Sequence, residues 1–200
     1  MKKLSSIIAV ATLVLMTIAS PALASPGHSE HTVPFKGSVL ALDNGQIFPP
    51  FEEEPVEGCL EWAEWQFFSR GTGQVSHLGR SDLDLIQCSR FVNDAGDGYS
   101  EGRASFTAAN GDMLVLTYDL DWKSYVTDFG APDGFDGAGT WTVLEGEGSG
   151  RFADATGSGM IEVIGDIPFD DTPMFGLPPG GTLWTFDGMI AYDASSRSRR

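Results

Sequence analysis

Histidine and tryptophan are the residue types whose side chains suggest chemistry most directly in this sequence, which has three of the first and five of the second. His77 has the strand parity of Val75, which places its imidazole on the inner face of a strand expected over residues 74–80. A neutral imidazole there is suited to act as a general base near pH 7. The interpretation we prefer is a hydrogen-bonded interior or rim histidine, and no catalytic residue is assigned.

Metal-ligating residue types occur in three segments. His28, Glu30 and His31 offer donors for a divalent metal. The Asp- and Gly-rich segments 93–98 and 128–136 offer the hard oxygen ligands that calcium prefers. Neither of these two segments has the alternating acidic spacing of an EF-hand loop, and turn chemistry explains Asp and Gly there without a metal. Because a polar leader explains the histidines, the sequence predicts no metal and no cofactor.

Aromatic side chains offer a surface for an apolar ligand. The five tryptophans are Trp62, Trp65, Trp122, Trp141 and Trp184. Aromatic residues on alternating strand positions belong more often to a core than to a binding surface, so most of them should be packing residues. The inward residues of the clearest strands, together with the histidine, form the predicted lining of a ligand site: His77, Phe106, Trp141 and Trp184.

The two cysteines, Cys59 and Cys88, are an even count that predicts one disulfide in an oxidising compartment. The bond would close a loop of 30 residues, 59 through 88, worth about 3.5 kcal/mol in the chain-entropy model. The alternatives are two buried thiols and, less favoured, a catalytic cysteine.

The elements that position these residues are predicted to be strands, because short alternating runs recur between Gly, Asn and Asp. The clearest is a hairpin of residues 102–109 and 112–120 with Asn110-Gly111 in a type I′ turn. Further strands are expected over 35–42, 65–70, 74–80, 83–91, 140–145, 159–165 and 182–192, and connections over 93–98, 128–139 and 167–181. The fold class is all-β, a single antiparallel barrel of about eight strands, with a β-sandwich as the rival.

The N-terminus has the pattern of a cleavable secretory signal peptide. Lys2 and Lys3 precede an apolar run of about 12 residues, and Pro21-Ala-Leu-Ala24 predicts cleavage before Ser25. The run is too short to cross a hydrocarbon core of roughly 30 Å. The predicted organisation is a signal peptide 1–24, a flexible leader 25–33, a β-barrel domain 34–193 and a basic tail 194–200. We therefore expect an exported protein, periplasmic or secreted, with no membrane insertion after processing.

The charge of the expected mature body is strongly negative. Seven basic residues stand against all 28 acidic residues between positions 25 and 194, which leaves this part of the chain at −21. Such a body repels phosphate backbones, so nucleic acid is not an expected partner. Solubility is the simplest explanation of the acidity.

Three segments together resemble the bacterial proteins with an allene oxide cyclase-like barrel domain: Ser76-His-Leu-Gly-Arg80, Ala104-Ser-Phe-Thr-Ala-Ala-Asn-Gly-Asp112 and Gly148-Ser-Gly-Arg-Phe-Ala-Asp-Ala-Thr-Gly157. The resemblance covers about residues 34–192 and implies a small antiparallel barrel, similar to allene oxide cyclases and dirigent proteins of plants. The plant cyclases fold a reactive epoxide of a fatty acid inside the barrel without a cofactor. Their catalytic residues have no assigned counterpart in this sequence.

The function predicted from these observations is the binding of a small apolar or amphipathic ligand by an exported barrel, without covalent chemistry. One alternative is a cofactor-free cyclase or isomerase, or a dirigent-like protein, acting on a lipid-like substrate. The other is a structural or partner-binding envelope protein. Whether the protein is an enzyme, and its oligomeric state, are left open by the sequence.

Overall fold

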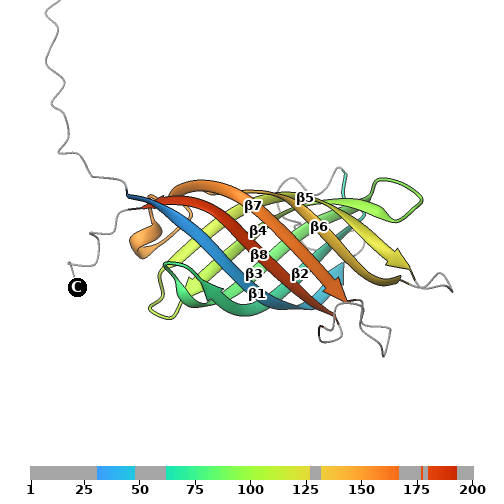
Figure 1. Cartoon of the computed structure of the whole chain (residues 1–200), viewed down its shortest axis with the longest axis horizontal. Helices are drawn as coiled ribbons and strands as arrows, with labels where there is room; N and C mark the ends of the chain where they lie inside the picture. Colours follow the sequence, from blue (N-terminus) through green and yellow to red (C-terminus); the bar gives the residue numbers. More distant parts are fainter. Residues whose placement is uncertain (1–30, 48–61, 127–131, 167–176, 178–179, 193–200) are drawn as a thin grey trace, which may run out of the picture.

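The fold is a closed barrel of eight antiparallel strands, each hydrogen-bonded to its neighbours in chain order (Figure 1). The computed structural model describes residues 31–47, 62–126, 132–166, 177 and 180–192. Within them the strands are β1 (His31–Ile47), β2 (Trp65–Val75), β3 (Gly79–Phe91), β4 (Asp97–Ala108), β5 (Met113–Val126), β6 (Pro132–Val143), β7 (Thr156–Asp166) and β8 (Gly181–Tyr192). The predicted all-β barrel is confirmed, and the sandwich alternative is wrong because β8 pairs with β1 and closes the sheet.

The strand expected over residues 74–80 is wrong. β2 ends at Val75, which pairs in register with Gly79 at the start of β3, so the chain reverses between them. His77 lies in this turn with a φ of 66°, a left-handed conformation that few residues other than glycine adopt. Strand parity therefore does not set the direction of its imidazole.

The connection expected over residues 128–139 is also wrong in most of its length, because β6 begins at Pro132. Its glycines belong to the strand rather than to a loop. A Cβ added to Gly137 would lie 2.8 Å from the Asp121 carbonyl oxygen, and one added to Gly139 would lie 2.6 Å from the Leu120 Cα. These glycines therefore allow the backbones of β5 and β6 to approach closely.

The hairpin of β4 and β5 is confirmed, but its turn is not of type I′. Among the described residues of the turn only Gly111 has a positive φ, of 84°, whereas type I′ requires two such residues. The Gly111 amide donates to the Ala108 carbonyl at 2.8 Å, and the Asp112 amide donates to the Asn110 side chain at 3.2 Å. A type I turn followed by a left-handed glycine accounts for this pattern.

The two ends of the barrel differ. At one end, the closed end, lie the turn 76–78, the turn 109–112, the connection 144–155 and the two termini of the sheet. At the other end, which we call the mouth, the chain connects β1 to β2, β3 to β4, β5 to β6 and β7 to β8. Successive connections lie at opposite ends of the barrel because every strand is antiparallel to the next.

The closed end is filled by the connection between β6 and β7. A 3-10 helix, η1 (Gly150–Phe152), places the Phe152 ring 4.9 Å from that of Tyr192, and Phe152 is 1% exposed. The Arg151 guanidinium stacks over the Phe152 ring at 4.9 Å, and its Nε lies 3.2 Å from a carboxylate oxygen of Asp112. The plug is thus held to the β4–β5 turn by a largely buried ion pair.

The interior next to the plug is a packed aromatic core. The Phe35 ring meets the rings of Phe106, Trp141 and Phe186 edge to face, with centroids 6.1, 5.1 and 6.5 Å away. All four side chains are at most 1% exposed. Edge-to-face aromatic contacts of this kind add specific attraction to the burial of apolar area.

Several sequence predictions fall outside the described residues. These are the signal peptide 1–24, most of the leader 25–33, the tail 194–200, His28, Glu30 and Cys59. Cys88 is 5% exposed on β3, and its disulfide with Cys59 stays a prediction. Among the described residues there is no helix long and apolar enough to cross a membrane.

Candidate functional site

The candidate site is the half of the barrel interior that lies nearer the mouth, which we call the mouth half. Strand register and burial assign to it the inward-facing residues Trp65, Phe67, Ser69, Gln87, Ser89, Phe91, Gly98, Ser100, Tyr118, Leu120, Trp122, Phe135, Thr182 and Trp184. Phe67, Gln87, Trp122 and Phe135 are only half-buried, although they face inward. The inward residues around Phe106 in the other half are fully buried. These four side chains therefore keep part of their surface accessible, whereas the residues around Phe106 do not.

A chain of neutral polar side chains crosses the mouth half from β5 to β3 and β4. The Tyr118 hydroxyl donates to Gln87 Oε1 at 3.0 Å, and Gln87 Nε2 donates to Ser89 Oγ at 3.0 Å. Ser89 Oγ and Ser100 Oγ lie 2.8 Å apart, and Trp122 Nε1 donates to Ser100 Oγ at 3.0 Å. Ser89 and Ser100 are fully buried, so these hydrogen bonds replace the water that their hydroxyls lose.

Two indole N–H groups in the mouth half have no partner. Trp65 is 7% exposed and Trp184 is 3% exposed, and the Nε1 atom of each is buried without a hydrogen bond. Trp141, in the other half, donates its N–H to the Met160 carbonyl oxygen at 2.9 Å. Buried polar groups are nearly always paired, and an unpaired one costs about 1–3 kcal/mol. The mouth half therefore contains two donors that lack an acceptor.

Aromatic rings line the mouth half beside these donors. The Trp65 ring lies 4.7 Å from Phe91 and 6.2 Å from Trp122, and Trp184 packs on Tyr118 at 5.5 Å. Phe91 is 46% exposed, although its strand position faces inward, which places it at the rim. An apolar group entering from the mouth would meet ring surfaces rather than charges.

The mouth half holds no charged group among the inward-facing side chains that the structure describes: all of those on β1 to β8 are apolar, Ser, Thr, Gln, Tyr or Trp. Such an interior offers hydrogen bonds and apolar contacts but no ion pair. Asp43 of β1 is paired in register with Ser69, and its side chain lies outside the described part.

Three of the four predicted lining residues, Phe106, Trp141 and Trp184, belong to one buried hydrophobic core. Within it the Trp184 ring contacts Tyr118 of the mouth half, whereas Phe106 and Trp141 contact Phe35. His77 lies at the closed end, where its Nε2 is 2.9 Å from the Pro34 carbonyl oxygen and its Nδ1 is 3.2 Å from the Tyr192 hydroxyl. The structure therefore does not bring His77 together with Trp184, and the histidine ties the turn 76–78 to β1 and β8.

The polar chain of the mouth half was missed by the sequence analysis, although the strand over 83–91 carried a signal for it. Leu83 and Leu85 share one face of β3 with Gln87 and Ser89, so this face changes from apolar to polar along the strand. A change of this kind on an inward face predicts an interior that is dry at one end and hydrogen-bonded at the other.

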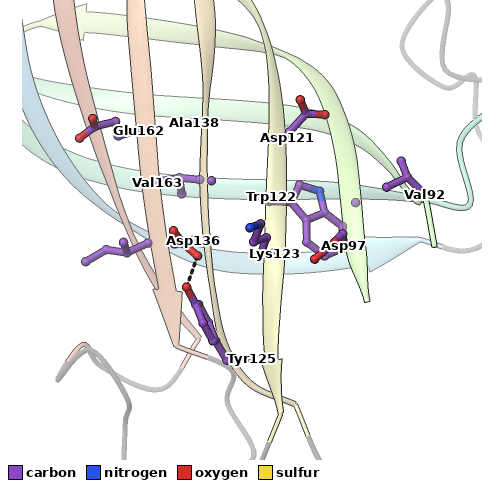
Figure 2. A pocket seen from close by; sticks show the side chains of 13 residues that line it. Val92, Asp97, Asp121, Trp122, Lys123, Tyr125, Asp136, Ala138, Glu162 and Val163 are labelled. Carbon is purple, nitrogen blue, oxygen red and sulfur yellow. Dashed lines mark hydrogen bonds between the residues drawn. The ribbon is translucent and has the colours of Figure 1, made fainter. Parts of the chain in front are cut away.

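The outer wall carries a groove of about 640 Å³ over β4 to β7, shown in Figure 2. Carboxylates from four strands line it together with a single lysine: Asp97, Asp121, Asp136, Glu162 and Lys123. The Tyr125 hydroxyl donates to the Asp136 carboxylate at 2.6 Å, and this bond raises the pKa of the phenol. No group of three or more His, Cys, Asp or Glu in the described part of the chain is arranged to hold a metal ion.

The segment suggested as a calcium loop is a side-chain-stabilised turn. Asn93 Oδ1 accepts from the Ala95 and Asp97 amides at 2.9 and 3.1 Å, while its Nδ2 donates to the Asp97 carboxylate at 2.9 Å. Asn and Asp are favoured in turns because their side chains make such local bonds. The Asp97 carboxylate is thus engaged by the turn itself.

No protein-family model, no curated protein and no solved structure matches this chain.

Proposed function

We propose that the protein binds a small amphipathic molecule in the mouth half of its barrel and carries out no covalent chemistry on it. The observation that supports this most strongly is the pair of buried, unpartnered indole N–H groups of Trp65 and Trp184. A ligand with a polar group would complete their hydrogen bonds, and its apolar part would pack against the surrounding rings. We further propose that the protein acts after export, with a Cys59–Cys88 disulfide.

A second candidate, the cofactor-free cyclase or isomerase, rests on one register position. Acid–base chemistry needs an ionisable group within hydrogen-bond reach of the substrate. Among the positions of β1 to β8, Asp43 stands opposite Ser69 of the mouth half. If the protein is such an enzyme, Asp43→Asn abolishes turnover of a lipid-like epoxide and leaves binding of that molecule intact.

The binding proposal can be tested with N-phenyl-1-naphthylamine, a small amphipathic dye whose fluorescence rises when it leaves water. Phe67 and Phe68 are neighbours on β2 and both half-buried, but only Phe67 has the register of the inward row. Phe67→Asp puts a charge in the mouth half, whereas Phe68→Asp puts the same charge on the other face of the strand. We expect dye affinity to fall at least about tenfold for Phe67→Asp, since the carboxylate must keep its water.

Phe68→Asp is the matched control and should bind the dye within about twofold of the unmodified protein. Circular dichroism of both variants establishes that the barrel is folded. The proposal is contradicted if the folded, unmodified protein takes up no dye, or if both substitutions lower the affinity equally.

A further inference from the structure

We infer that the ligand of the mouth half is an uncharged molecule that presents a hydrogen-bond acceptor oxygen, of the ketone or ester kind, to the Trp184 indole N–H. This inference rests on the proposed binding function and specifies the class of ligand. Its basis is the difference between the tryptophans whose N–H group is paired within the protein and those whose N–H group is not.

Four tryptophans face the interior from described strands. They form two groups, according to whether the indole N–H group has a hydrogen-bond partner in the protein. Trp141 donates to the Met160 carbonyl oxygen at 2.9 Å and Trp122 donates to Ser100 Oγ at 3.0 Å. Trp65 and Trp184 donate to nothing, although their Nε1 atoms are buried. An indole N–H can only donate, so the group that completes these two sites must be an acceptor.

Trp184 is the better defined of the two donors. It is 3% exposed, lies between Val39 and Val163 in register and stacks edge to face on Tyr118 at 5.5 Å. The Tyr118 hydroxyl donates its proton to Gln87, so it is not a second donor for a ligand oxygen that binds Trp184. An acceptor atom of a ligand therefore has one free donor to bind beside the Tyr118 ring.

The charge of the surroundings selects an uncharged acceptor. No Lys, Arg or His is among the inward-facing side chains that the structure describes, so a carboxylate placed there would be buried without a counter-ion. The overall net charge of the chain, −16, adds repulsion against an anion. An ammonium group fails for a different reason, because it has no acceptor lone pair to offer the indole.

Three probes with ten carbons separate these possibilities: 2-decanone, decanoate and decylammonium, each tested at pH 7 for displacement of bound N-phenyl-1-naphthylamine. The dye carries no oxygen, so its uptake does not depend on the acceptor site. We expect 2-decanone to displace the dye at concentrations at least about tenfold lower than either charged probe, the difference that one satisfied buried hydrogen bond makes.

Trp184→Phe keeps an aromatic ring and removes the N–H group. It should weaken 2-decanone about tenfold more than it weakens the dye, whose binding does not use the N–H group, and circular dichroism shows whether the barrel is folded. Trp122→Phe is the matched control, because it removes an N–H group of the mouth half that is already paired with Ser100. In the Trp122→Phe variant, the ratio of the 2-decanone affinity to the dye affinity should be the same as in the unmodified protein.

The inference is overturned if the dye binds but the three probes compete equally, if decanoate or decylammonium competes best, or if Trp184→Phe and Trp122→Phe affect 2-decanone alike. Failure of the dye to bind at all overturns the proposed function, and this inference with it. The two failures are therefore distinguished by the dye alone, before any probe is added.

Discussion

At the scale of single residues, the mouth half is organised by buried hydroxyl groups rather than by charges. Ser100 is central, because its oxygen is shared by Ser89 and by the Trp122 indole. Each partner is left unpaired when this oxygen is removed, and an unpaired buried group costs more than an ordinary hydrogen bond contributes.

Ser100→Ala should therefore lower the free energy of unfolding by about 2 kcal/mol, measured by urea denaturation. Ser38→Ala, on the exposed outer face of β1, serves as the control and should change it by less than about 0.5 kcal/mol. Equal, small effects of both substitutions would show that the serine–tryptophan chain does not stabilise the barrel.

Tyr99 gives a prediction for alkaline pH. Burial of the phenol raises its pKa, and so does its hydrogen bond to Glu101 at 2.6 Å. Below about pH 10 the phenol is protonated in both states, so its contribution to stability is complete. As the pH rises above that value the unfolded chain loses this proton while the folded chain keeps it, so unfolding becomes easier.

Tyr99→Phe removes this contribution and should make the stability fall less steeply above about pH 10. Denaturation at a series of alkaline pH values measures the slope, and tyrosinate absorbance of the folded protein follows the titration directly. An unchanged slope, with Tyr99 ionising at the pH of a free tyrosine, would contradict the assignment.

At the scale of elements, alternation of apolar and polar residues predicted most of the strands, because a half-buried strand shows it directly. It failed for β6, where Gly134, Gly137 and Gly139 resemble a loop. The reason is that glycine is selected there by close approach to β5, which only tertiary structure reveals. The mouth half was missed for a similar reason. Gln87 and Ser89 can be recognised as members of a hydrogen-bonded chain only when the positions of β4 and β5 are known.

Gly98 and Trp122 lie opposite each other, in register on β4 and β5. The three atoms nearest to a Cβ added at Gly98 all belong to the Trp122 ring, and Ser100 and Phe91 hold that ring in place. Gly98→Ala should therefore cost about 2 kcal/mol of stability, because it overpacks a filled site.

The same substitution made together with Trp122→Phe tests the cause. The smaller ring leaves room for the methyl group, so the two effects should be coupled by at least about 1 kcal/mol. Strict additivity of the two substitutions in urea denaturation would mean that Gly98 is required by its backbone conformation rather than by the ring.

At the scale of the whole molecule, the barrel combines a plugged end, a packed aromatic half and a half whose inward polar and aromatic side chains are partly exposed. The sequence predicted closure because eight strands can pair without leaving an edge. It did not predict the asymmetry between the ends, which arises from the Arg151–Phe152 plug and from the polar change along β3. This asymmetry is what limits the candidate site to the mouth.

The disulfide predicted between Cys59 and Cys88 belongs to the same scale, because it would constrain the unfolded chain over 30 residues, 59 through 88. Reduction should lower the free energy of unfolding by about 3.5 kcal/mol, and a Cys59→Ser, Cys88→Ser double variant should show no effect of reductant. Two titratable thiols in the folded, untreated protein would rule the bond out.

The central claim, that a small molecule enters the mouth half, is tested most directly by nuclear magnetic resonance of the indole N–H groups during titration with N-phenyl-1-naphthylamine. The five tryptophans give five such signals, which substitution assigns one by one. We expect the signals of Trp65, Trp122 and Trp184 to shift, while that of Trp141, held by the Met160 carbonyl oxygen, stays in place. A shift confined to Trp141 or Trp62, or no shift at all, would contradict the account.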